Sequence, residues 1–340
     1  MRKQLPRREF IRYATTTATG LGLIAPFSNV FASRITDPLK RIGIIGLDTS
    51  HSVAFAKALN GPNPSPNYTG FTITAAYPRG SADIESSVKR LAGYTEDVKK
   101  LGIDIVDSVD ELLNRCDFIL LETNDGRPHL EQALQVIKAG KTLFIDKPIA
   151  GSLSDAIAIY EAAAKYKVPV FSSSSLRYME TVQDVIKGKI GKVLGADAFS
   201  PATLEKTHPD LFWYGIHGVE ILFAVMGKGC KEVVRVSSAN TDIVVGSWQD
   251  GRTGTFRGTR TGTHDYGGTA YGEKGNLVLG PFKGYDNLLD QIISFFRSGV
   301  PPVSAEETLE IYTFMEAADE SKRNGGKAVQ LVEVYKKAKR

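Results

Sequence analysis

One lysine of this sequence stands where an ammonium group could take part in chemistry. Residues 142–145 form a short apolar run, expected to be a strand, that ends abruptly at Asp146, Lys147 and Pro148. Ligands of open α/β sheets bind outside the carboxyl ends of the strands, and the proline restricts the backbone directly after the lysine. Lys147 is therefore a candidate ligand contact. The alternative is a solvated lysine at the end of a surface strand.

A second candidate site is the turn that follows the first apolar strand of the chain. Gly46 opens this turn, and a strand, a tight turn and a helix N-terminus together suit a pyrophosphate. The two further glycines typical of such a turn are replaced by Asp48 and His51. A carboxylate at Asp48 disfavours a nearby pyrophosphate but could cap the helix, as could Thr49 or Ser50. The alternative that this turn binds no dinucleotide therefore stays open.

The next strand, residues 71–76, should end near the ribose of a dinucleotide bound at that turn. The loop after it contains Arg79 and Ser81, which could accept a 2′-phosphate and so favour NADP over NAD. The alternative is an ordinary arginine in a surface loop.

A third group of polar and aromatic side chains lies between His208 and Glu220. His217 has a side chain that titrates near neutral pH, and Glu220 follows one helical turn later and could orient it. Taken alone, His217 is more simply a structural histidine, and Glu220 a solvated helix residue. Residues 212–214 are all aromatic, which suits either stacking on a sugar face or a buried core.

Length and composition favour a two-domain globular protein. The 340 residues are 42% hydrophobic and 24% charged, which is ordinary for a globular chain. The formal net charge of +4 arises from residues 1–32, where five lysines and arginines oppose one glutamate. The remainder is neutral and gives no case for nucleic-acid binding. The two cysteines, Cys116 and Cys230, belong to no metal-ligand spacing, so we expect no bound metal.

The first 32 residues resemble a twin-arginine export signal. Arg7 and Arg8 precede an apolar run over residues 13–26, and small residues then offer a cleavage site before Ser33. The alternative is an N-terminal membrane anchor, but the run is shorter than the roughly 20 apolar residues that a span needs. We expect a periplasmic protein exported by the twin-arginine machinery, with no stable membrane span.

Two stretches of the chain resemble one known family. The run "AGKTLFIDKPIAGSLSDA", preceded by "CDFILLETNDGRPHLEQALQVIK", is similar to the Glu-Lys-Pro region of the glucose–fructose oxidoreductase, inositol dehydrogenase and MocA (Gfo/Idh/MocA) family. A C-terminal stretch that begins "TAYGEKGNLVLG" resembles the same family, so the likeness covers about residues 40 to 332. Asp146 stands where the family usually has glutamate.

The resemblance implies roles for several residues. The family lysine, Lys147 here, contacts both the nicotinamide side and the substrate hydroxyl. The loop that contains Thr123 and Asn124 lies under the nicotinamide in the family. His217 matches the histidine of the family pattern Asp-x-Gly-x-His and is then the general base. The aspartate of that pattern is replaced by Trp213, so the family's proton-shuttling pair is incomplete here.

The expected fold is an α/β Rossmann-type dinucleotide-binding domain followed by an α+β domain with a mostly antiparallel open sheet. We place the first domain at residues 38–150 and the second, a substrate and oligomerisation domain, at residues 151–340. Residues 151–172 are expected to complete the first sheet, and residues 1–32 form the signal peptide. Residues 260–272 should form an ordered loop or a strand return.

These arguments give a set of candidate site residues. The catalytic candidates are Lys147 and His217. The candidate substrate contacts are His208, Trp213 and Tyr214. The candidate cofactor contacts are Gly46, Asp48, Thr49, Ser50, His51, Arg79, Ser81, Thr123, Asn124, His129, Asp146, Lys147 and Pro148.

The function that follows is a periplasmic nicotinamide-dependent oxidoreductase acting on a CH–OH group of a sugar, glycoside or polyol. NAD or NADP would stay tightly bound and be recycled, because no free nicotinamide pool exists outside the cytoplasm. We expect a homo-oligomer. The alternative is a non-catalytic sugar- or nucleotide-binding protein on the same scaffold, which the altered glycine turn and the missing aspartate favour.

Overall fold

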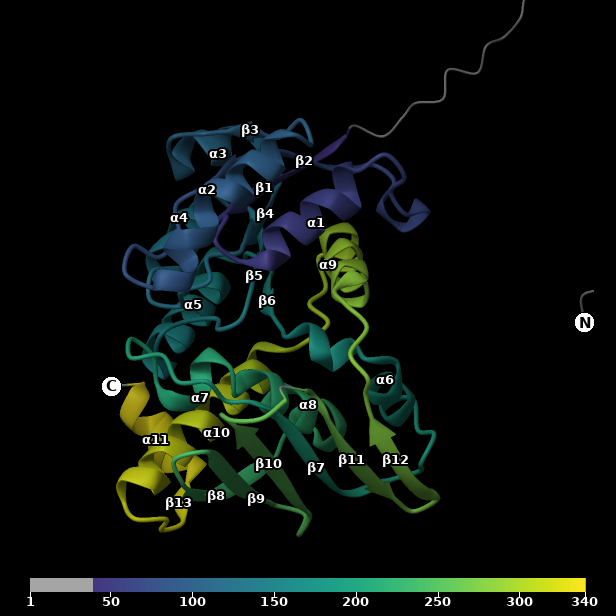
Figure 1. Ribbon diagram of the computed structural model, residues 1–340, viewed down its shortest axis with the longest axis vertical. Coiled ribbons are helices and arrows are strands. Elements are labelled where there is room, and N and C mark those ends of the chain that lie inside the picture. The colour runs from purple at the N-terminus through teal and green to yellow at the C-terminus, as the bar shows by residue number, and fades with distance from the viewer. Residues whose placement is uncertain (1–38, 264, 340) are drawn as a thin grey trace, which may run out of the picture. The chain divides into compact units, whose positions relative to one another are not determined.

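The first sheet consists of six parallel strands in the order β3-β2-β1-β4-β5-β6. The structure is a computed structural model that describes residues 39–263 and 265–339. Figure 1 shows this sheet in the upper half of the view. Its strands are β1 (Lys40–Ile45), β2 (Phe71–Tyr77), β3 (Asp104–Ile105), β4 (Phe118–Leu121), β5 (Thr142–Ile145) and β6 (Val170–Ser172).

Helices alternate with these strands along the chain, as parallel pairing requires. The central strands are apolar runs because they are covered on both faces. The helices of this half are α1 (Ser50–Asn60), α2 (Glu85–Lys99), α3 (Val109–Arg115), α4 (His129–Lys138) and α5 (Leu153–Tyr166). The predicted Rossmann-type fold is confirmed.

The strand order reverses between β1 and β4, which lie side by side at the centre of this sheet. Ligands of such sheets bind in the crevice at this switch point, outside the carboxyl ends of the strands. Gly46, Glu122 and Asp146 directly follow β1, β4 and β5. The fold therefore brings three chain-distant residues to one edge of the sheet.

The second sheet has seven strands in the order β12-β11-β7-β10-β9-β8-β13. All its pairs are antiparallel except β7 with β10. Buried and less buried residues alternate along β9, as expected of a sheet covered on one face. The predicted mostly antiparallel sheet is confirmed. Its strands are β7 (Val193–Pro201), β8 (Cys230–Ser237), β9 (Thr241–Trp248), β10 (Thr253–Thr259), β11 (Gly267–Gly272), β12 (Gly275–Leu279) and β13 (Val329–Gln330).

Helices of the second half cover this sheet and reach back to the first. Helix α8 (Ile216–Met226) packs on β7 and β10, and α10 (Ala305–Arg323) packs on β8 and on α5. The backbone amide of Ile149 donates to the hydroxyl of Tyr312 at 2.7 Å, which ties α10 to the segment after β5. One buried cluster takes side chains from both halves, so the two sheets share a core. The other helices of this half are α6 (Glu180–Ile186), α7 (Asp210–Trp213), α9 (Asp286–Ser298) and α11 (Leu331–Ala338).

One expectation about local structure has a clear outcome. The stretch 260–272 was expected to be a loop or a strand return, and its last residues form β11. The expected signal peptide lies outside the described residues. Within the described part of the chain, no helix combines the length and apolar character that crossing a bilayer requires.

Candidate functional site

A small cavity lies where the switch point of the first sheet meets the second half of the chain. Its volume is about 80 Å³. Its walls come from α1, from the loops after β4 and β5, and from the start of α8. Among its lining residues are Ser50, His51, Asn124, Lys147, Tyr214 and His217. The structure thus brings together both catalytic candidates, although they come from different halves.

Lys147 reaches this cavity from a buried backbone. The residue is only 8% exposed. Its backbone amide donates to Oδ1 of Asp146 at 2.8 Å, and its Nζ lies 5.6 Å from the ring centroid of Tyr214. The aromatic face stabilises a cation at this distance. The solvated-lysine alternative does not apply, because the side chain points into a cavity rather than into bulk water.

His217 enters the same cavity from the first turn of α8 and is also buried. Its Nδ1 lies 2.7 Å from Oγ of Ser174. Burial, followed by the charges of Lys147 and His51, lowers the pKa of His217 well below 6.5. The imidazole is therefore neutral at physiological pH and able to accept a proton.

Glu220 neither orients His217 nor is a solvated helix residue, the two alternatives that the sequence left open. Glu220 accepts hydrogen bonds from Oγ of Ser173 at 2.8 Å and from Nε of Arg177 at 2.6 Å. Both partners are buried with it, so the carboxylate is committed to an internal ion pair. Ser174, which sequence reasoning missed, makes the contact to the imidazole instead.

The turn at Gly46 keeps the geometry of an anion site. Gly46 has a φ of +92°, and a Cβ there would lie 2.5 Å from the backbone nitrogen of Thr123. No side chain caps α1 at Thr49, so the amide groups of its first turn have no side-chain acceptor. Arg90 and Lys147 line the cavity beside this helix end. These features fit the pyrophosphate of a dinucleotide.

Asp48 does not cap α1. Its side chain is buried and accepts hydrogen bonds from the amides of Ser81 and Asn124, both at 3.0 Å. It therefore fastens the turn after β1 to the loops after β2 and β4. Ser81 also uses its hydroxyl internally, donating to Asp83 at 3.1 Å. Arg79 is exposed, and neither Arg79 nor Ser81 lines the cavity, so the structure does not bring them to it.

The remaining cofactor candidates are buried around this site. His129 places its ring nitrogens 2.7 Å from the carbonyl oxygen of Thr123 and 3.2 Å from that of Ile149, which makes it a structural residue of this loop. The hydroxyl of Thr123 donates to Gln132 at 3.1 Å. Asn124 lines the cavity while its amide donates to Ser87 at 3.1 Å. Pro148 is buried next to Lys147.

A second cavity of about 440 Å³ adjoins the first and shares Asn124 and Tyr214 with it. Trp213 and Tyr266 also line it, so three aromatic side chains face it from the second half. Aromatic faces stack well against the apolar faces of sugar rings. Burial raises the pKa of Tyr266 to about 12, so its hydroxyl stays protonated and can donate. Sequence reasoning missed Tyr266, since its loop carries no motif.

His208 does not reach either cavity. Its side chain is fully buried, and its Nε2 accepts from the amide of Gly126 at 3.2 Å and lies 3.3 Å from Asp125. Its ring packs 5.0 Å from that of Trp213. The expectation that His208 contacts substrate is therefore corrected: it holds the loop after β4 against the second half.

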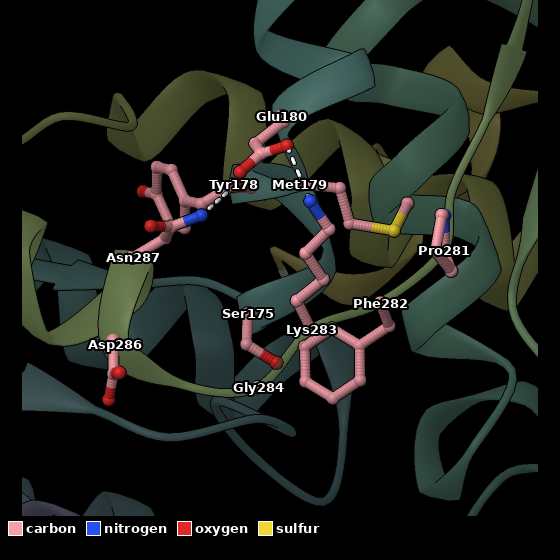
Figure 2. Close-up of a pocket in the computed structure, with 10 residues that line it drawn as sticks. All are labelled: Ser175, Tyr178, Met179, Glu180, Pro281, Phe282, Lys283, Gly284, Asp286 and Asn287. Atoms are coloured by element: carbon pink, nitrogen blue, oxygen red, sulfur yellow. Dashed lines mark hydrogen bonds and ion pairs between the residues drawn. The ribbon is translucent and has the colours of Figure 1, made fainter.

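A third cavity of about 170 Å³ lies between residues 175–180 and 281–287 (Figure 2). Three of its polar side chains are paired with neighbours: Lys283 binds Glu180 at 2.7 Å, and the Asn287 amide donates to the carbonyl of Tyr178 at 2.8 Å. None of the sequence-predicted site residues lines it. We therefore regard it as a neighbour of the site and not as part of it.

Below the cavity that holds Lys147 and His217 lies an acidic residue, Glu122, that sequence reasoning missed. Glu122 directly follows β4, is fully buried and lies near Asp146 and His51. Burial, followed by the charge of Asp146, raises the pKa of Glu122 well above its usual value. For Asp146, burial is outweighed by the charges of His51 and Lys147, and its pKa is lowered. The signal available in the sequence was a glutamate directly after the apolar run of β4.

A parallel sheet with a ligand cavity at its switch point, closed by a second sheet, defines a two-domain protein of the dinucleotide-binding α/β class. Residues 40–174 match the family model described as "Oxidoreductase family, NAD-binding Rossmann fold" (GFO_IDH_MocA). This match spans all six strands of the first sheet.

Solved structures share the fold across both halves. Scyllo-inositol dehydrogenase from Lactobacillus casei, solved with NAD(H) and scyllo-inositol, has a TM-score of 0.67 at 16% identity, covering 86% of this chain and 99% of that one. Myo-inositol 2-dehydrogenase from Lactobacillus plantarum has a TM-score of 0.70 at 16% identity, with coverages of 86% and 99%. Among curated proteins, no sequence matches this chain.

Proposed function

We propose that this protein is a periplasmic nicotinamide-dependent oxidoreductase acting on a CH–OH group of a sugar, glycoside or polyol. One observation carries the proposal: Lys147 and His217 line a single cavity together with the uncapped N-terminus of α1. A proton acceptor, a hydrogen-bond donor and an anion site are the groups that oxidation of an alcohol beside a dinucleotide requires.

The chain's residues have distinct parts in this chemistry. The nicotinamide, when bound, supplies the hydride acceptor. Lys147 hydrogen-bonds the reacting hydroxyl from its rigid position after β5, and neutral His217 takes the hydroxyl proton. The first-turn amides of α1 hold the pyrophosphate. Trp213 and Tyr214 lie beside the larger cavity, where a sugar ring can stack.

Tight retention of the cofactor is part of the proposal. A protein outside the cytoplasm meets no free nicotinamide pool, so the bound cofactor is recycled by a second substrate or by a redox-neutral reaction. The direct test is mass spectrometry of the natively purified protein for NAD(H) or NADP(H). The second step is single-turnover absorbance of the bound cofactor with a panel of sugars, glycosides and polyols. A protein that holds no nicotinamide cofactor and binds none contradicts the proposal.

Export is a separate part of the proposal and rests on the leader sequence. Replacing Arg7 and Arg8 by lysine is expected to retain the protein inside the cell, because the twin-arginine machinery reads this pair. The measurement is the distribution of the protein between periplasmic and cytoplasmic fractions. Unchanged export of this double variant contradicts the assignment. We further propose a homo-oligomer, which light scattering of the purified protein tests.

A non-catalytic binding protein is a second candidate, and one observation favours it. Asp48 and His51 replace two glycines of the turn, and Asp48 uses its carboxylate to hold neighbouring loops. A turn fastened in this way leaves less room for a dinucleotide. A protein that binds sugars from the panel while its cofactor, if any, never changes redox state would support this candidate.

A further inference from the structure

Three ionisable side chains meet at the switch point, below the cavity that holds Lys147 and His217. His51 comes from α1, Glu122 from the end of β4 and Asp146 from the end of β5. One potential ligand atom from each lies within 4.8 Å of the others. Nδ1 of His51 is 2.9 Å from Oδ2 of Asp146 and 4.0 Å from Oε2 of Glu122.

These side chains are buried, and their converging atoms are unpartnered. His51 is 4% exposed, Asp146 1% and Glu122 0%. Nδ1 of His51, both carboxyl oxygens of Glu122 and Oδ2 of Asp146 make no hydrogen bond within residues 39–263 and 265–339. The 2.9 Å approach between His51 and Asp146 is within ion-pair distance but leaves both atoms without a hydrogen bond. Buried polar atoms in such numbers require a common partner, because burying them unpaired is costly.

We propose that His51, Glu122 and Asp146 form a binding site for a divalent metal cation. One imidazole nitrogen with two carboxylates is a ligand set that suits Zn²⁺, Mn²⁺ or Fe²⁺. A single cation between them partners all four orphaned atoms. A proton on Glu122 could instead join one of its oxygens to one neighbouring atom, which would still leave two of the four atoms unpaired.

The local charge agrees with a divalent cation. The carboxylates of Asp48, Glu122 and Asp146 lie close enough to influence one another, and Lys147 is the ammonium group near them. With Glu122 deprotonated, as metal binding requires, three carboxylates against one ammonium group leave two negative charges in a buried volume. A divalent cation neutralises both, and buried charges are otherwise unfavourable without a counter-ion.

The surroundings of the site hold the ligands in place, as the outer partners of metal ligands do. The other oxygen of Asp146, Oδ1, accepts from the backbone amide of Lys147 at 2.8 Å. The ring of His51 packs against that of Tyr285, with centroids 4.2 Å apart. His51 also lines the cavity, which gives an ion a path to the site. The cation would fix the backbone from which Lys147 extends.

The test is the metal content of the full chain purified without chelators, measured by inductively coupled plasma mass spectrometry. The chain is then stripped with EDTA and titrated with Zn²⁺, Mn²⁺ and Co²⁺ by calorimetry. We expect one divalent cation per chain and a higher midpoint of thermal unfolding when the cation is bound. Neither readout depends on enzymatic activity, so the outcome is separate from that of the proposed function.

Variants identify the ligands. Glu122→Gln, Asp146→Asn and His51→Asn are each expected to weaken cation binding at least about a hundredfold, since even outer partners of a metal site cost 10–100-fold when removed. Asp319→Asn is the matched control: this buried carboxylate pairs with Arg235, which also binds Asp242 at 2.9 Å. The control should keep the affinity of the unaltered chain.

Two results overturn the proposal. One is an unaltered chain that contains no divalent cation and takes up none of the three metals after stripping. The other is a bound cation whose affinity the three ligand variants leave unchanged. Circular dichroism checks that each variant is folded, and if one variant does not fold, the unaltered chain and the other two decide.

Discussion

Oγ of Ser174 lies 2.7 Å from Nδ1 of His217, so a residue of the segment after β6 holds the imidazole that enters the cavity from α8. Ser174 also accepts from the amide of Leu176 at 3.3 Å, which fixes the hydroxyl. Nε2 of His217 has no hydrogen-bond partner among residues 39–263 and 265–339. The ring therefore has one nitrogen tied to the protein and one available to a ligand.

Ser174→Ala is expected to lower kcat by about fivefold, because a hydrogen bond contributes about 1 kcal/mol and 1.36 kcal/mol corresponds to tenfold in rate. KM should change little, since Ser174 acts through His217. Ser173→Ala is the matched control: its hydroxyl donates to Glu220, and it should leave turnover unchanged. Steady-state kinetics of both variants make the comparison, and equal rates for the two would remove Ser174 as a positioning residue.

Lys147→Ala and His217→Ala are each expected to slow turnover by at least about a hundredfold, as loss of a general acid or base does. The double variant should lose much less than the product of the two, because groups that act on one proton are not additive. Single-turnover absorbance of bound cofactor is the measurement. Near-normal rates in His217→Ala would exclude it as the base and direct attention to Tyr214, which lines the same cavity.

As pH falls, kcat/KM should begin to decline only at a pH below the ordinary pKa of histidine. Burial and the charges of Lys147 and His51 lower the pKa of His217 well below 6.5, so the base stays neutral as pH falls through 6.5. We expect kcat/KM to hold through that pH and to decline only below it. A decline centred at 6.5 or above would contradict the role of His217.

The lowered pKa of His217 also affects the stability of the folded protein. In the unfolded chain His217 takes up a proton near pH 6.5, whereas the folded protein resists it. The free energy of unfolding should therefore fall as pH drops from 6.5 toward the folded pKa. Urea unfolding at several pH values measures this slope, which His217→Ala should reduce.

Gly46→Ala is expected to abolish cofactor retention. The φ of +92° strains any side chain, and a Cβ would lie 2.5 Å from the backbone nitrogen of Thr123, so the turn must move. Gly70→Ala is the matched control, because its φ is +86° but its Cβ would meet nothing within 4 Å. Released cofactor is measured by absorbance after denaturation. Full retention in Gly46→Ala would place the dinucleotide elsewhere.

The sequence by itself determined which residues stand at the carboxyl ends of the parallel strands. Apolar runs that end at Gly46 and Asp146 define strand ends locally, and parallel pairing then places those ends at one edge. The Rossmann-type fold and the placement of Lys147 at a strand end follow from such local patterns, whereas the mostly antiparallel second sheet was expected from the family resemblance.

The tertiary structure alone decided which of these residues pair. Glu220 binds Arg177 and not His217, although the helical spacing suits His217 equally well. Asp48 turns to the amides of Ser81 and Asn124 rather than capping the adjacent helix. The physical reason is that a buried polar group bonds whichever partner the packing places beside it. Spacing along the chain does not determine which polar groups pair when the partners come from different strands and loops.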